Sequence, residues 1–506
     1  MSQIFHNIKI GLDEELEDHL QWMAPNYSSY HILRKSVDAR RRHSPQIVFS
    51  VEVFSENEAP PKVDFDIDRV AYSGAPVLII GSGPAGLFAA LRLLERGIPC
   101  IVFEQGSSTE QRMKHINRYW RYGELNSRNN VCFGEGGAGL YSDGKLITRI
   151  KSPHIPYVLR RLVDFGAPEE ILYLANPHVG SDRLRRIIPH IRKHILSSGG
   201  QIYFNTKVQS LLLEPDRVIG VQTEDGAKHF SDHIILACGH SATDLFEHLQ
   251  QQGVHIEGKS FALGLRIEHP QKLIDQIQYR EFAGHPKLGV ANYKITHHDD
   301  KNDVGVYSFC MCPGGYVLSS GTEADGLVSN GMSNYNRNSP YANAAVVVTV
   351  DHEKSFGNDL WGGMKMRRQL EREAFHQVQK AGGIRQLPVQ KITDFIDGKL
   401  GKALKGSCPS GVLPLRLDEL LPPTITNYLR EGLERFSKTM PEFITDQGQF
   451  YGVETRTSCP LRITRDKTTL QSLSHQGLYP TGEGAGYAGG ITSAACDGVR
   501  VADAIF

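Results

Sequence analysis

The sequence has no excess of charge of either sign. Its 506 residues contain 56 Lys and Arg against 56 Asp and Glu, so the chain as a whole has no electrostatic reason to bind nucleic acid or an anionic membrane. It also lacks any apolar run near the roughly 20 residues that a membrane-spanning helix needs, and Met1 to His6 do not have the pattern of a signal peptide. We therefore expect no nucleic-acid partner, no membrane span and a cytoplasmic location.

Cysteine motifs are scarce as well. The eight cysteines are scattered, and none are spaced as Cys-x-x-Cys, a pattern typical of reduced thiols rather than of a disulfide framework or a zinc site. Cys310 and Cys312 are two positions apart. On a regular strand such residues lie roughly 6.6 Å apart, close to the upper limit for a disulfide. We expect two small buried hydrophobic side chains there; the alternative is that one thiol lines the cofactor site.

Spacing identifies neither a metal site nor a catalytic group. The stretch His297-His298-Asp299-Asp300 contains residue types that bind metals, but it continues into polar residues, and adjacent side chains point apart on a strand. We therefore expect a surface loop there and no metal ion. No Ser-His-Asp arrangement can be assigned from the sequence, so it names no catalytic acid, base or nucleophile.

One stretch carries a specific motif. Four apolar residues, Val77 to Ile80, run into Gly81-x-Gly83-x-x-Gly86; an apolar helical stretch follows, and a second apolar run ends in Glu104, 18 positions after Gly86. In a βαβ unit the first glycine permits the turn, the second lets a pyrophosphate approach the backbone, and the third lets the helix pack on the sheet. An acid about 20 residues further on binds the ribose. The stretch therefore predicts a dinucleotide-binding unit.

This fingerprint occurs once in the chain. Pro84 suits the first turn of its helix, where the missing N–H costs nothing, and the free N–H groups there face the phosphates. The comparable later strand end, Ala237 to Ala242, lacks the second and third glycines and an acid at the right spacing. We therefore expect no dedicated NAD(P)H domain, and the electron donor or acceptor stays unknown.

Two further glycine-rich segments have the character of a cofactor cradle. Glycine makes up 50 of the 506 residues, above the usual share of about 7%. Residues 132–145 hold five glycines among Phe133, Leu140 and Tyr141, which favours an ordered, partly buried loop over a mobile one. Residues 477–491 lead into a predicted helix, whose N-terminus can stabilise negative charge on a reduced flavin.

The patterns predict an α/β fold in three parts. Residues 1–72 form a small N-terminal α/β module, with a helix and three strands. Its 8 Lys and Arg against 12 Asp and Glu make Arg40 to Arg42 a solvated strand end rather than an RNA-binding arm. Residues 73–257 and 445–506 form a Rossmann-type domain with a parallel sheet, and residues 258–444 form a mixed, β-rich substrate domain inserted in it.

Local signals predict the elements between the glycine-rich residues 132–145 and the insert that begins at residue 258. We expect a helix from Arg183 to Leu196, capped by Ser181 or Asp182. A single strand from Gln201 to Leu213 should follow, and then a hairpin whose turn is Glu224-Asp225-Gly226. The buried strand His233 to Gly239 returns the chain to the cofactor edge of the sheet.

Together these segments resemble a two-domain flavoprotein of the glutathione-reductase-like class, and more closely the uncharacterised FAD-dependent dehydrogenase family of bacteria. The matching segments span nearly the whole chain: Ser36 to Arg41, Gly81 to Gly86, Gly134 to Lys145, Asn330 to Ser333, Gln369 to Arg372, Leu421 to Pro423, and Tyr479 to Ile491.

The resemblance implies FAD as the cofactor. It implies that Glu104 binds the adenosine ribose and that Gly482 and Glu483 contact the ribityl and phosphate portion; many relatives carry Asp at the position of Glu483. It places Arg112 near the adenosine half and backbone groups of Val208 near the adenine. The expected cofactor-binding residues are Gly81, Ser82, Gly83, Pro84, Ala85, Gly86, Glu104, Gln105, Arg112, Gly136, Gly137, Lys145, Val208, Gly239, Gly482, Glu483, Gly489, Gly490 and Ile491.

Three functions fit these observations. The leading hypothesis is an FAD-dependent oxidoreductase, a dehydrogenase or reductase, that moves a hydride or electron pair to or from an unidentified small molecule. The alternatives are an FAD-containing RNA-modifying or regulatory protein, and a non-catalytic flavin-binding scaffold. The sequence specifies neither the substrate nor the oligomeric state.

Overall fold

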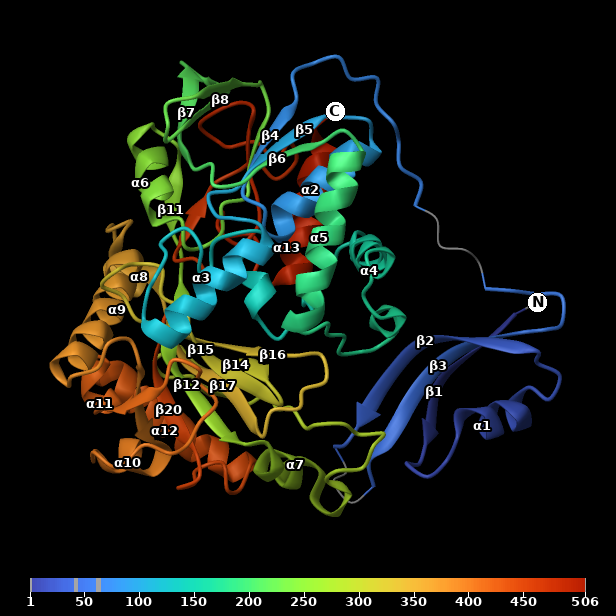
Figure 1. Cartoon of the computed structure of the whole chain (residues 1–506). Coiled ribbons are helices and arrows are strands. Elements are labelled where there is room, and N and C mark those ends of the chain that lie inside the picture. Colours follow the sequence, from blue (N-terminus) through green and yellow to red (C-terminus); the bar gives the residue numbers. More distant parts are fainter. Residues whose placement is uncertain (1, 41–43, 61–64, 506) are drawn as a thin grey trace.

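The computed structural model describes residues 2–40, 44–60 and 65–505 (Figure 1). Arg41 and Arg42 of the arginine triplet lie outside these residues. Over the described part of the chain, no helix is both long and apolar enough to cross a membrane. The main sheets are a five-stranded parallel sheet, a seven-stranded mixed sheet and a three-stranded N-terminal sheet, which confirms the predicted α/β class.

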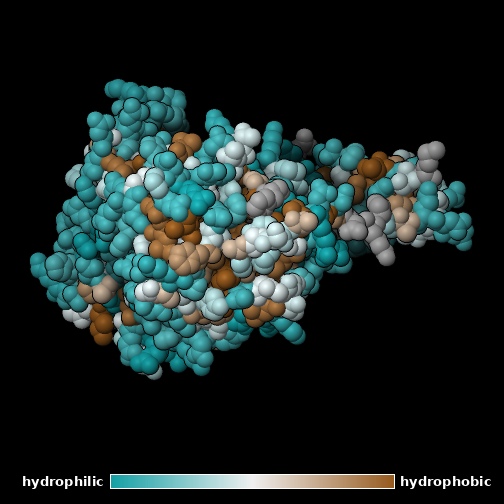
Figure 2. Space-filling model, turned by 90° about the horizontal axis from the view of Figure 1, so that it is seen from above, coloured by the Kyte–Doolittle hydropathy of each residue, from teal (hydrophilic) through white to brown (hydrophobic). Residues whose placement is uncertain are grey.

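The N-terminal module projects from one side of the molecule in two perpendicular views (Figure 1, Figure 2). Its sheet has the antiparallel order β1-β3-β2. Leu16 and Leu20 of its helix are buried in the same core cluster as the apolar side chains of β3. The backbone of Lys35 exchanges hydrogen bonds with Tyr173 and Ala175, which ties the module to the rest of the protein. Its elements, all predicted, are β1 (Gln3–Ile10), α1 (Leu16–Met23), β2 (Ser29–Asp38) and β3 (Gln46–Phe54).

The parallel sheet forms because its central strands are continuous apolar runs that can be buried on both faces. All residues of β4 and β10 are buried. The strand order is β22-β10-β4-β5-β6, and every neighbouring pair is parallel. The strands are β22 (Leu478–Pro480), β10 (Ile234–Leu236), β4 (Val77–Ile80), β5 (Cys100–Phe103) and β6 (Gln201–Tyr203).

Alternate residues of β4 enter two different cores. Val77 and Ile79 pack with three helices on one face of the sheet, whereas Leu78 and Ile80 pack with a three-stranded meander and a helix on the other (Figure 1). The three helices are α2 (Pro84–Glu95), α5 (Ser181–Ser197) and α13 (Ile491–Ala504). The other face is covered by β7 (Val208–Glu214), β8 (Arg217–Thr223), β9 (Lys228–Phe230) and α6 (Thr243–Gln251).

The mixed sheet lies below the parallel sheet in Figure 1, with helices α9 to α12 at its side. Its order is β13-β14-β17-β12-β20-β18-β19, antiparallel except for the last pair. The strands are β13 (Thr296–Asp299), β14 (Val304–Cys312), β17 (Tyr341–Val350), β12 (Phe261–Pro270), β20 (Gln449–Glu454), β18 (Leu387–Lys391) and β19 (Val412–Pro414); the helices are α9 (Gly362–Lys380), α10 (Ile392–Asp397), α11 (Leu417–Leu420) and α12 (Pro423–Thr439).

The insert extends further along the chain than predicted. Strand β20 lies after residue 444 but pairs with β12 and β18 inside the mixed sheet. The predicted end at 444 is therefore wrong by at least the length of this strand. A short buried strand does not show in the sequence which of two sheets it joins, because both would bury the same apolar side chains.

Two local predictions near the parallel sheet also need correction. The strand expected over residues 201–213 is split into β6 and β7, which belong to different sheets, because Asn205 adopts a left-handed backbone with φ 55° that a regular strand cannot include. Helix α5 starts at Ser181 and its N-cap is Gly180. The Asp182 carboxylate instead accepts a hydrogen bond from the N–H of Tyr335, at 2.7 Å.

The predicted loop at His297 and His298 is an edge strand. These residues belong to β13, where they pair with Val306 and Gly305 of β14. Charged and polar residues suit such a strand because one edge faces solvent. No group of three or more metal-binding side chains occurs in the described residues.

Candidate functional site

A deep cavity opens at the carboxyl ends of the parallel strands, where α/β sheets bind their ligands. Its volume is about 1880 Å³, and this figure includes the part of the cavity that is open to solvent. The ends of β4, β5, β10 and β22 form one wall, and residues of the mixed sheet form another. The site therefore lies between the five-stranded parallel sheet and the seven-stranded mixed sheet.

Each of the three positions of the fingerprint requires glycine for a different steric reason. Gly81 has φ 104°, and a Cβ added there would lie 2.4 Å from the carbonyl oxygen of Ala237. A Cβ on Gly86 would lie 1.9 Å from the carbonyl oxygen of Gly81, so only glycine lets α2 approach the turn. At Gly83 the nearest atom to an added Cβ is Gly137 Cα, at 3.8 Å. Gly83 thus borders open cavity, as a close approach by pyrophosphate requires.

Glu104 is buried and joins two loops of the cavity. Its Oε2 accepts hydrogen bonds from the N–H and hydroxyl of Ser82, at 3.0 and 2.8 Å. Its Oε1 accepts from the N–H groups of Gly106 and Gly134, at 2.9 and 3.1 Å. The fingerprint does not predict this role, because one of the partners, Gly134, comes from a loop 30 positions away. Glu104 also lines the cavity, and its contact with a ribose stays a prediction.

Arg112 lies behind the cavity wall rather than in it. Its guanidinium is fully buried and donates to the carbonyl oxygens of Asn130, Val131, Gly134 and Glu135, at 2.7 to 3.2 Å. A direct contact with a ligand is not supported by this geometry. Arg112 instead fixes the backbone of the glycine-rich loop, and no local sequence signal distinguishes this role from that of a solvated arginine.

The glycine-rich loop at residues 132–145 is ordered and largely buried, as predicted. The side chain of Asn130 accepts hydrogen bonds from the N–H groups of Cys132 and Phe133, both at 3.0 Å. Asp143 accepts from Ser333, the last residue of β16 (Ser329–Ser333) in a separate two-stranded sheet, at 2.5 Å, and from Arg337, at 2.8 Å. The loop is therefore tied to both sides of the cavity.

The C-terminal glycine-rich segment, which leads into helix α13, lines a further part of the cavity. Asp497, inside α13, accepts from Thr481 Oγ1 and from the N–H of Gly482, both at 2.8 Å, and pairs with Arg465. Glu483 lines the cavity, and burial raises its pKa to about 7. Gly490 precedes the first helical residue, so the N-terminus of α13 borders the cavity.

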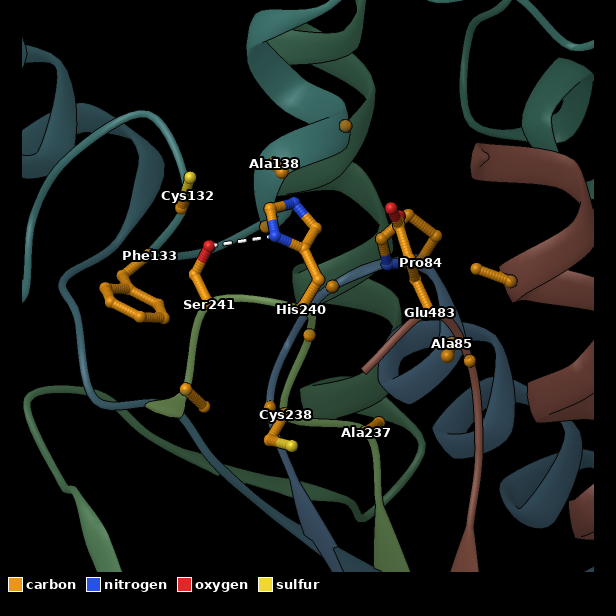
Figure 3. A pocket seen from close by; sticks show the side chains of 18 of the residues that line it. Pro84, Ala85, Cys132, Phe133, Ala138, Ala237, Cys238, His240, Ser241 and Glu483 are labelled. Atoms are coloured by element: carbon orange, nitrogen blue, oxygen red, sulfur yellow. Dashed lines mark hydrogen bonds between the residues drawn. The ribbon is translucent and has the colours of Figure 1, made fainter. Parts of the chain in front are cut away.

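His240 and Ser241 follow β10 and face into the cavity. In Figure 3 they lie between Cys132 and Phe133 on one side and Pro84 and Glu483 on the other. Ser241 Oγ lies 2.9 Å from His240 Nδ1. Burial lowers the pKa of His240 to about 3, reinforced by nearby arginines. The imidazole is therefore neutral at physiological pH.

The insert contributes a buried ion pair that reaches this cluster. Arg456 donates to Ser241 Oγ at 3.1 Å and pairs with Glu371 at 2.6 Å. Arg456 lines the cavity, and its ion pair with Glu371 of α9 lies behind it. Sequence reasoning missed both residues and His240, because they meet only in the folded chain.

The structure brings most of the predicted cofactor-binding residues to this cavity. Four do not line it: Ser82, Gly86, Arg112 and Gly136. The residues that line it are Gly81, Gly83, Pro84, Ala85, Glu104, Gln105, Gly137, Lys145, Val208, Gly239, Gly482, Glu483, Gly489, Gly490 and Ile491.

Cys310 and Cys312 are not both buried, as was expected first. Cys312 is buried, but Cys310 lines the cavity, so the alternative of one thiol at the site holds. The strand is not regular here: the pairing of β14 with β17 shifts register between Phe309 and Cys312, and Cys310 has φ 46°.

These features fit an extended dinucleotide. An added Cβ at Gly239 or Gly489 would meet no atom within 4 Å, and at Gly490 only Ser493 Oγ at 4.0 Å. Gly239 gives bare backbone after β10, whereas Gly83 and the pair Gly489 and Gly490 give it at the N-termini of α2 and α13, where N–H groups are free to bind anionic groups.

Family comparisons agree with this geometry. Residues 74–116 match the family described as FAD binding domain, residues 176–304 match FAD dependent oxidoreductase, and residues 260–457 match FAD-dependent protein, C-terminal domain-like. The last match includes β20, in line with its place in the mixed sheet. The cofactor is FAD.

An uncharacterised protein of Clostridium beijerinckii is 39% identical over 525 residues, covering 99% of this chain and 98% of its own. Among solved structures, CtdE in complex with FAD is 13% identical, covers 85% of this chain and 84% of its own, and has a TM-score of 0.32. Glycine oxidase from Bacillus cereus is 12% identical, covers 85% and 94%, and has a TM-score of 0.32.

Proposed function

Because this chain belongs to the same family as the clostridial protein, a family of FAD-dependent oxidoreductase type, we propose that it transfers a hydride or electron pair between FAD and a small organic molecule. The shape of the cavity carries this proposal. It runs from the N-terminus of α2 to Phe309, Cys310 and Asn330 of the mixed-sheet domain. One continuous space can hold a dinucleotide and still adjoin a second ligand.

The chain's own groups would hold the cofactor along this space. The free N–H groups at the start of α2 suit the pyrophosphate, and those at Gly490 suit negative charge at the other end. Glu104 remains the proposed ribose ligand. Glu483, with its pKa near 7, can donate or accept a hydrogen bond at neutral pH. When bound, FAD supplies a reversible carrier of two electrons.

We expect NADH and NADPH to reduce the bound FAD slowly or not at all. Among the described residues, one sheet is parallel throughout and has the dinucleotide fingerprint at its strand ends, and that unit is used for FAD. Little preformed surface would then hold a nicotinamide. Mixing oxidised holoenzyme anaerobically with either nucleotide and following the flavin absorbance measures this. Fast, saturable bleaching at micromolar nucleotide would contradict it.

Reoxidation of the reduced enzyme, followed by the same flavin absorbance, tests the proposed function. Holoenzyme is reduced with dithionite, freed of excess reductant and mixed anaerobically with quinones, disulfides and conjugated ketones. A redox enzyme should be reoxidised by at least one class with a rate that saturates. If every compound reacts no faster with the protein than with free reduced FAD, a flavin-binding scaffold is the better description.

A further inference from the structure

The bulge in β14 brings one cysteine, Cys310, to the cavity and leaves a second, Cys312, buried two positions away. Without a bulge, residues 310 and 312 would continue the ladder to β17. Instead, Phe309 pairs with Ala345 and Cys312 with Asn343, so β14 has two residues between the two pairs where β17 has one. Cys310 takes up the difference in a left-handed conformation, φ 46°, which side chains other than glycine rarely adopt. Such outliers concentrate at functional sites.

The two thiols have different surroundings. Cys310 is partly exposed and lines the cavity, and Cys312 is fully buried behind it. The Cys312 Sγ lies 3.3 Å from the carbonyl oxygen of Cys310, to which Arg266 also donates at 3.5 Å. The regular-strand spacing that disfavours a disulfide does not apply to a residue that leaves the strand conformation.

Charged groups around the pair favour a thiolate at Cys310. The adjacent Cys312 thiol lowers the pKa of Cys310 below its usual range, with help from the charges of Lys145 and Arg266 and against the effects of burial and of Asp143. The pKa of Cys312 is raised by the same interaction. Glu483 also faces this thiolate, which adds to the rise in its own pKa. An exposed thiolate beside a protonated, buried thiol has the character of an attacking and a resolving cysteine.

We propose that Cys310 and Cys312 form a redox-active dithiol that exchanges two electrons with a small disulfide in the cavity and with FAD. The proposal rests on the oxidoreductase function above and names its substrate class. The strongest support is that Cys310 and a cation, Lys145, both line the cavity, and that a second thiol, Cys312, contacts the carbonyl oxygen of Cys310 from behind.

The proposed exchange consists of two thiol–disulfide substitutions followed by a two-electron reduction. The Cys310 thiolate attacks one sulfur of a disulfide RSSR, forms a mixed disulfide and releases one RS⁻. Cys312 gives up its proton, attacks the Cys310 sulfur and releases the second RS⁻, which takes the proton. Bound FAD, in its reduced form, would supply the two electrons and one proton that restore Cys310 as a thiolate and Cys312 as a thiol.

An electron count on the holoenzyme tests the proposal. Wild type is oxidised with hydroxyethyl disulfide, desalted and titrated anaerobically with dithionite. We expect uptake of four electrons per FAD in the wild type and of two in Cys310→Ser. Cys312→Ser should instead keep a mixed disulfide between Cys310 and one half of the reagent, seen as added mass on the intact protein. Cys238→Ser is the matched control and should keep four: Cys238 also lines the cavity and has a second cysteine, Cys459, near it, but burial raises the pKa of both thiols.

Two outcomes separate this proposal from the proposed function. A wild type that takes up two electrons per FAD overturns the dithiol and leaves the oxidoreductase intact. A protein without reducible FAD overturns the oxidoreductase itself. Peptide mapping of the oxidised wild type, which requires no variant to fold, should find Cys310 linked to Cys312; finding both cysteines open to alkylation after oxidation contradicts the proposal.

The pH dependence of alkylation gives a readout that a structural cysteine would not produce. Because the thiolate is the reactive form and increases as pH rises through the pKa, iodoacetamide should modify Cys310 with a half-maximal rate at a pH well below the ordinary thiol value of about 8.5. In Cys312→Ser the midpoint should move up, toward the ordinary value of about 8.5. A wild-type midpoint above pH 8 would show that Cys310 is not a thiolate at neutral pH.

Discussion

Replacing Gly83 with valine should remove FAD from the protein while the chain still folds. Gly83 has φ −74° and ψ −176°, a conformation that valine adopts without strain. The nearest protein atom to an added Cβ is 3.8 Å away, so the protein itself does not clash with the start of the side chain. The space it fills is the one that the pyrophosphate needs. We expect affinity for FAD to fall at least roughly 100-fold, or about 2.8 kcal/mol.

Two companion variants show that this effect is on binding. Gly83→Ala adds one carbon and should reduce affinity less than Gly83→Val. Gly86→Ala should impair folding instead, since its Cβ would lie 1.9 Å from the carbonyl oxygen of Gly81. Flavin absorbance after reconstitution measures binding, and circular dichroism measures folding. Full FAD occupancy in Gly83→Val would show that the phosphates bind elsewhere.

Replacing Arg112 with methionine should lower both stability and FAD content. Methionine keeps much of the apolar volume but leaves the four loop carbonyl oxygens without their donor. Each buried group left unsatisfied costs about 1–3 kcal/mol, so we expect a loss of roughly 4 kcal/mol or more in the free energy of unfolding. The glycine-rich loop would then lose its fixed backbone, and FAD its cradle.

Arg118→Met is the matched control on the same helix, α3 (Thr109–Tyr122). Arg118 is largely exposed and pairs with Glu124 at the surface, and such pairs contribute about 0–1 kcal/mol. Urea unfolding of the FAD-free proteins compares the variants directly. If Arg112→Met lost less than about 1 kcal/mol, or kept full FAD occupancy, the loop would not depend on this arginine as the hydrogen bonds indicate.

The sequence predicted the parts of the site that depend on short-range backbone geometry. Gly81, Gly83 and Gly86 each meet the steric demand that the motif implies, because those demands arise within one strand, turn and helix. The parallel strands were readable for a similar reason: residues such as Val77 to Ile80 are apolar on both faces and must be buried.

The parts that escaped prediction depend on contacts between distant segments. The carbonyl groups around Arg112 come from a loop 18 to 23 positions away, and Arg456 meets Ser241 across 215 positions. The bulge at Cys310 is set by pairing with β17, which the strand's own residues do not encode. Periodicity reports which face is buried, and it does not report which partner covers that face.

The account rests on FAD bound in the cavity between the two sheets, and the released chromophore tests this most directly. The protein, purified without added flavin or reconstituted with FAD if it is colourless, is denatured, and the supernatant is compared with FAD, FMN and NAD standards. We expect one FAD per chain, because the fingerprint with Glu104 requires an adenosine half. FMN alone, or no flavin after reconstitution, would contradict the account.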